Sequence, residues 1–85
     1  MMIPLLTEDQ LRSASAEATG YIVDVRSGDP CIVHRAGCLR VDMGIFRSRV
    51  VIDRGRAGSF LLGRSLAAAR AEAGDDAIFC PACLS

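Results

Sequence analysis

The stretches His34-Arg35-Ala36-Gly37-Cys38 and Cys80-Pro81-Ala82-Cys83 decide how this chain of 85 residues must fold. The first stretch pairs an imidazole with a thiol, and the second pairs two thiols with two residues between them. One imidazole and three thiolates in two short pairs are the ligand set of a closed tetrahedral zinc site. The sequence therefore predicts one Zn2+ ion per chain and a fold that brings together its ligands, His34, Cys38, Cys80 and Cys83.

The remaining cysteine, Cys31, offers an alternative first ligand pair, because it stands three residues before His34. Either Cys31 or His34 would then not bind the metal. In an extended segment these two side chains face opposite sides, whereas a turn at Gly37 would return Cys38 toward His34. We therefore expect Cys31 to be a small buried hydrophobic residue, and we keep it as the alternative to His34.

Two other uses of cysteine are less consistent with the sequence. A redox-active C-x2-C motif needs a helix behind its first cysteine to lower the thiol pKa, and with two residues after Cys83 we expect none. Disulfide frameworks belong to small secreted domains. The apolar start, residues 1–6, has no basic segment and is too short for a secretory signal or a membrane span. We therefore expect a cytoplasmic protein without membrane contact.

Length and composition predict a single domain, residues 1–85, that depends on its metal. A core of this size gives marginal stability, and structural zinc can add on the order of 10 kcal/mol in small domains. Hydrophobic residues make up 51% of the chain, but it has one Tyr, three Phe and no Trp, so the core is built from small side chains. The formal net charge of zero neither favours nor excludes nucleic acid.

A helix is expected over residues 8–18 and should stop at Gly20. Thr7 and Gln10 have the spacing of a capping box, in which each side chain hydrogen-bonds to the other residue's backbone N–H. Leu6 and Leu11 have the spacing of a hydrophobic staple across the same helix end. A second helix is expected over residues 65–73, capped by Ser65 and stopped by Gly74.

The remaining elements are short. Residues 21–26 and 31–34 predict a hairpin around the turn 27–30. We also expect a helical turn at 39–43 ended by Gly44, a strand at 49–53, and a strand or extended segment at 59–62. The predicted fold class is α+β, a small zinc-stabilised domain with a short antiparallel β-sheet of three to four strands, an N-terminal helix and a helix before the C-terminal C-x2-C motif.

The pieces Ile32 to Cys38, Phe60 to Ala73 and Phe79 to Cys83 carry a family resemblance. In this order they are similar to the metal-binding domain of the Ada DNA-repair methyltransferase and to small bacterial proteins of that shape. The resemblance implies a zinc-binding β/α core over residues 21–83. Ada-like domains that accept a methyl group use the first cysteine of the first pair, and that position is His34 here. The resemblance therefore does not extend to methyl transfer.

A basic segment separates the two ligand pairs. From Gly44 to Ala71 the chain has six Arg and one acid, and residues 44–58 form an insertion relative to the Ada-like pattern. Such a stripe can hold a phosphate backbone. The candidate nucleic-acid-binding residues are Arg47, Arg49, Arg54, Arg56 and Arg64. The alternative is a solvated surface whose arginines pair with acidic side chains.

These observations predict a binding module rather than an enzyme. The zinc shell closes without an open position for water, and the sole histidine is committed to it, so we expect neither catalysis nor a small-molecule substrate. The first interpretation is a zinc-stabilised nucleic-acid-binding or regulatory module, with DNA or RNA as partner. The alternative is a zinc-stabilised protein-interaction module, an inhibitor or adaptor that binds a protein partner or forms a homodimer.

Overall fold

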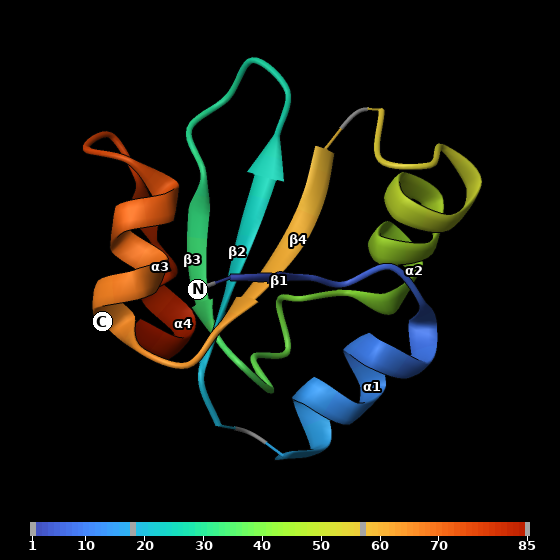
Figure 1. Cartoon of the computed structure of the whole chain (residues 1–85), viewed down its shortest axis with the longest axis horizontal. Helices are drawn as coiled ribbons and strands as arrows, with labels where there is room; N and C mark the ends of the chain where they lie inside the picture. Colours follow the sequence, from blue (N-terminus) through green and yellow to red (C-terminus); the bar gives the residue numbers. More distant parts are fainter. Residues whose placement is uncertain (1, 18, 57, 85) are drawn as a thin grey trace.

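A mixed five-stranded sheet with helices on both faces forms the protein (Figure 1). The computed structural model describes residues 2–17, 19–56 and 58–84. The strand order is β1-β4-β2-β3-β5. The strands are β1 (Ile3–Pro4), β2 (Tyr21–Arg26), β3 (Ile32–Arg35), β4 (Gly58–Gly63) and β5 (Ile78–Phe79). Neighbouring strands run antiparallel, except that β5 runs parallel to β3.

The predicted α+β class is confirmed, but the predicted antiparallel sheet of three to four strands is wrong in detail. The additions are β1 and β5, which hold the two edges of the sheet. Each has two residues, too few for an alternating pattern to mark it. Because β5 pairs in parallel with β3, it carries the second ligand pair back beside the first.

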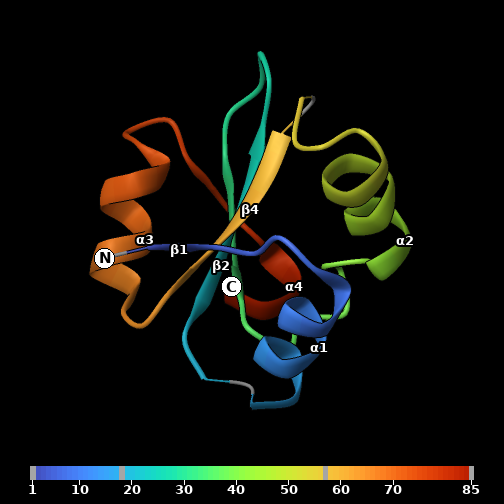
Figure 2. The same cartoon turned by 45° about the vertical axis from the view of Figure 1, so that its right-hand side comes forward.

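Helices cover the two faces unequally (Figures 1 and 2). One face is packed by α1 (Glu8–Glu17), α2 (Met43–Phe46) and the π-helix η1 (Arg47–Ile52), through Leu11, Phe46 and Val50. The other is packed by α3 (Leu66–Ala73), through Ala69 and Ala73. A one-turn helix, α4 (Pro81–Leu84), follows β5. No helix within the described ranges is long and apolar enough to cross a membrane.

The sheet is buried on both sides in its centre. The neighbouring β2 residues Ile22 and Val23 point to opposite faces, and both are 0% exposed. Ile22 packs against the α1 and α2 side, and Val23 against the alanines of α3. Helices therefore cover both faces of this strand.

The predicted strand at residues 49–53 is wrong, because this segment is helical in η1. Asp42 starts the helical segment by accepting hydrogen bonds from the backbone N–H groups of Gly44 and Ile45. Phe46 and Val50, four residues apart, then lie on the buried face. This tertiary packing outweighs the β-propensity of the Val-Val-Ile run. The sequence predicted that Gly44 would end a helical turn. This prediction is wrong, because Gly44 lies inside α2.

The two predicted long helices are confirmed. Gln10 N–H donates to Thr7 Oγ1, and the Gln10 side chain accepts from Thr7 N–H, as a capping box requires. Ser65 caps α3 by accepting from Ala68 N–H. The predicted last residue of the first helix, Ala18, lies outside the described residues. The predicted Leu6 staple is wrong, because Leu6 is 62% exposed and its neighbour Leu5 is the buried leucine.

Gly20 lies where the start of β2 meets the end of β4. Its φ of +89° lies in the left-handed region, and a Cβ atom there would stand 2.5 Å from the carbonyl oxygen of Gly63. Gly20 also accepts a hydrogen bond from Ala36 N–H in the segment between His34 and Cys38. Gly20 therefore contacts both the end of β4 and the segment that holds the first ligand pair.

Substitution of Gly20 by Ala should lower the free energy of unfolding by roughly 2–4 kcal/mol, because a backbone clash adds to the left-handed conformational cost. Gly28→Ala is the matched control. Gly28 has a similar φ of +83° but open space around it, so its loss should stay at about 1–2 kcal/mol. Denaturant unfolding of the two metal-loaded variants measures the difference, and equal losses would contradict the close approach.

Candidate metal centre

The centre begins with two neighbouring parallel strands. In the register of β3 and β5, Val33 pairs with Phe79. Cys80 N–H donates to Val33 O at 2.9 Å and continues this ladder by one residue. His34 and Cys80 are therefore side by side, and because side chains alternate along a strand they point to the same face of the sheet. The pairing of β3 with β5 therefore sets the positions of His34 and Cys80.

A tight turn after β3 supplies the third ligand. Cys38 N–H donates to Arg35 O at 3.1 Å, and Gly37 within the turn has a φ of +89°. This conformation suits glycine, which has no Cβ. The turn brings Cys38 back toward His34, as the sequence predicted.

The fourth ligand comes from α4. Cys83 N–H donates to Cys80 O at 3.3 Å, so the two cysteines of the C-x2-C motif lie on one helical turn. The expectation that no helix follows this motif is therefore wrong. Cys83 Sγ accepts a hydrogen bond from Arg35 N–H at 3.2 Å. This hydrogen bond connects the C-terminal turn to β3. Its donor is a backbone N–H group, which every residue except proline has, so the sequence could not predict it.

These residues form one compact cluster of ligand atoms. One ligand atom from each of His34, Cys38, Cys80 and Cys83 lies within 4.8 Å of the others. The Sγ atoms of Cys38 and Cys80 are 3.8 Å apart. Sulfurs bound to one tetrahedral zinc ion at about 2.3 Å stand about 3.8 Å from each other. The cluster is therefore compatible with a single metal ion.

The buried atoms of the cluster fit a metal as well as its distances do. His34 is 4% exposed, and its Nδ1 atom is buried without a hydrogen-bond partner among the described residues. A buried polar atom without a partner costs free energy, and bonding to a metal ion would remove that cost. Burial also lowers the pKa of His34, which keeps the imidazole in the neutral, metal-binding form.

The thiols of the C-x2-C pair differ in acidity. Burial, with Cys38 and Cys80 nearby, raises the pKa of Cys83 to about 11 despite the N–H of Arg35. Burial also opposes ionisation of Cys80, but hydrogen bonds from the Ala82 N–H, from the Cys83 and Cys38 thiols and from the Cys83 N–H together outweigh it, and the pKa of Cys80 is lowered. Three crowded sulfurs cannot all become thiolates without a cation to balance their charge. A divalent metal supplies that charge.

Cys31 stands outside the cluster. It packs against the apolar group formed by Val23, Val33 and Ala69, on the α3 side of the sheet. Burial raises the pKa of its thiol, with Asp76 as a further cause. Cys31 therefore has the environment of a small hydrophobic residue, and His34 has that of a ligand.

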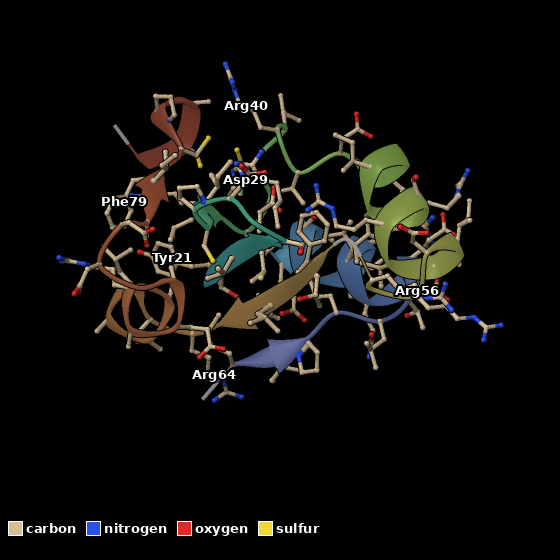
Figure 3. All side chains as sticks on the ribbon, turned by 90° about the horizontal axis from the view of Figure 1, so that it is seen from above. Tyr21, Asp29, Arg40, Arg56, Arg64 and Phe79 are labelled. Carbon is tan, nitrogen blue, oxygen red and sulfur yellow. The ribbon has the colours of Figure 1, made fainter. Side chains whose placement is uncertain are left out.

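The five arginines proposed as a nucleic-acid surface have different environments in the structure. Arg47 forms an ion pair with Glu8 of α1 at 2.6 Å. Arg49 forms a largely buried ion pair with Asp24 and stacks over the Phe60 ring at 4.9 Å. Arg54 and Arg56 are exposed in the loop after η1. Figure 3 shows Arg64 apart from Arg56, at the lower edge of the view, whereas Arg56 lies at the right.

Comparison with protein-family models, with curated proteins and with solved structures finds no match to this chain. The resemblance to the Ada metal-binding domain gains no support from these comparisons. The ligand cluster therefore carries the functional argument by its geometry and chemistry alone.

Two equivalent substitutions test the ligand set. Cys80→Ser should lose the metal and unfold, because a serine hydroxyl is a poor zinc ligand and structural zinc contributes on the order of 10 kcal/mol in small domains. Cys31→Ser makes the same chemical change outside the cluster and should keep stoichiometric metal. Metal analysis and circular dichroism of both variants measure the effects. Metal loss from Cys31→Ser would make Cys31 a ligand in place of His34, and metal retention in Cys80→Ser would contradict the cluster itself.

Proposed function

We propose that the protein is a zinc-stabilised, non-catalytic binding module. The observation that carries this proposal is the approach of four ligand atoms, from the separate segments 34–38 and 80–83, to within 4.8 Å of one another. Three sulfurs and one imidazole are the donors of structural zinc sites. In a chain of 85 residues, the ion contributes stability that the small core lacks.

A closed ligand shell supports a structural role over a catalytic one. Catalytic zinc keeps one position for water or substrate, whereas this cluster supplies all four ligands from the protein. The cluster also contains the chain's sole histidine. The metal would therefore hold the end of β3 to α4 and leave the surface to bind a partner.

The metal requirement has a direct test. Protein prepared without chelator should contain about one zinc ion per chain. Removal of the ion by a strong chelator under reducing conditions should unfold the protein, and Zn2+ should restore the fold. Mg2+ is the control ion and should not restore it, because Mg2+ prefers oxygen ligands to thiolates. Chelated protein that keeps its native circular dichroism would contradict the proposal.

A protein is the partner class that the surface supports best. Three apolar side chains on α2 and η1 are exposed: Ile45 at 49%, Val51 at 44% and Ile52 at 72%. Apolar side chains gathered on one surface segment are typical of protein-binding sites. The exposed Arg54 and Arg56 follow directly, so the partner surface should be apolar with acidic residues at its rim.

Nucleic acid is the second candidate, with support from the loop that holds Arg54 and Arg56. Both side chains are exposed. Arg54 lies in the turn after η1, with a φ of +55°, and Arg56 follows two residues later. The ion pairs of Arg47 and Arg49 weaken this candidate, because charge already neutralised by Glu8 or Asp24 attracts phosphate less.

Retention on nucleic acid distinguishes the two candidates. We expect the zinc-loaded protein to show no retention on duplex or single-stranded DNA or RNA, even at low ionic strength. If it is retained, affinity should fall steeply with salt, and the double variant Arg54→Ala, Arg56→Ala should reduce the salt slope by about one unit per lost phosphate contact. Arg12→Ala removes an exposed charge on α1, outside the five candidate residues, and serves as the control. Such retention would put nucleic acid in first place.

A further inference from the structure

Two sulfurs of the cluster lie close enough to form a disulfide if an oxidant removes two electrons. Cys38 Sγ and Cys80 Sγ lie 3.8 Å apart, although the residues are 42 positions apart in the chain. Cys38 belongs to the turn after β3, and Cys80 joins β5 to α4. A bond between these sulfurs would connect the same two segments that the metal connects.

We propose that the centre exchanges a metal cross-link for a disulfide cross-link when a hydroperoxide oxidises Cys38 and Cys80. This inference rests on the proposed zinc centre and adds a response of that centre to oxidants. Oxidation releases the ion, because two of its thiolate ligands are consumed. The fold persists, because the Cys38–Cys80 bond holds the end of β3 to the C-terminal turn in place of the metal.

The order of attack follows from exposure and hydrogen bonding. Cys80 is 1% exposed, whereas Cys38 and Cys83 are partly exposed, so a hydroperoxide reaches the latter two first. Cys83 Sγ accepts the N–H of Arg35, which draws electron density from the sulfur. Cys38 Sγ accepts no backbone N–H from the described residues. Cys38 is therefore the first sulfur to be oxidised.

The reaction balances with a hydroperoxide as the oxidant. The Cys38 thiolate attacks the peroxide oxygen, the O–O bond breaks, and with one proton the products are a sulfenic acid at Cys38 and water, or an alcohol. The Cys80 thiolate then attacks the Cys38 sulfur and displaces hydroxide, which takes up a second proton as water. Two thiolates lose two electrons, the hydroperoxide gains them, and Zn2+ leaves without a change of charge.

The identity of the disulfide decides whether the fold survives. A bond between Cys80 and Cys83 would stay within one helical turn and would form no covalent cross-link to β3. The bond from Cys38 to Cys80 spans the two segments. Cys31 packs on the opposite face of the sheet, with Val33, and therefore takes no part.

The test uses the full zinc-loaded chain and hydrogen peroxide. Zinc content is measured before peroxide is added, so that a failure of the proposed zinc centre is recorded separately. A chromogenic chelator then follows zinc release, circular dichroism follows the fold, and trypsin digestion without reduction locates the bond. Cleavage after arginine places Cys38 in peptide 36–40, Cys80 and Cys83 together in peptide 71–85, and Cys31 in peptide 27–35.

The expected result is about one zinc released per disulfide formed, a mass loss of about 2 Da, a native-like spectrum, and peptides 36–40 and 71–85 joined through Cys80. Fragmentation between Cys80 and Cys83 identifies the bonded sulfur. Cys31→Ser is the matched control and should give the same products. A disulfide confined to peptide 71–85, a bond to Cys83 or Cys31, irreversible sulfinic acids, or unfolding on zinc release would each overturn the inference.

Discussion

The contact between the end of β3 and the C-terminal turn is the constraint on which the rest of the structure depends. Two hydrogen bonds establish it, from Cys80 N–H to Val33 O and from Arg35 N–H to Cys83 Sγ. They bring three sulfurs and an imidazole to one place. Without a cation, the buried Nδ1 atom of His34 has no partner among the described residues, and the Cys83 thiol resists ionisation. The metal that we propose would cross-link the end of β3 to the C-terminal turn.

The core explains why such a cross-link matters. The two faces of the sheet are packed by separate groups of apolar side chains, with Phe46 and Phe60 as the largest on one face and alanines from α3 on the other. Neither group is large, and a domain of this size gains little stability beyond its entropy cost. The buried ion pair of Asp24 and Arg49 fixes η1 against the sheet, but a buried ion pair is weak evidence of stability.

The sequence predicted the elements whose signals are local. The capping residues Thr7 and Ser65 predicted α1 and α3, and the spacing of the ligand pairs predicted a cluster that the fold assembles. Signals that depend on distant partners were misread. The run Val50-Val51-Ile52 favours a strand by propensity, but Val50 is held in a helix by packing around Phe46. Arg49 belonged to a basic stripe in the sequence, and its partner Asp24 lies in another element.

The edges of the sheet have a consequence for the behaviour of the protein at high concentration. Exposed strand edges are templates for pairing with other chains, and proteins limit this with short edge strands and prolines. Both edges of this sheet have two residues, with Pro4 inside β1 and Pro81 directly after Cys80 beyond β5. A proline has no N–H to donate to a new strand. The molecule is therefore protected against growth into fibrils by edge-to-edge addition, even though Ile78 and Phe79 are exposed.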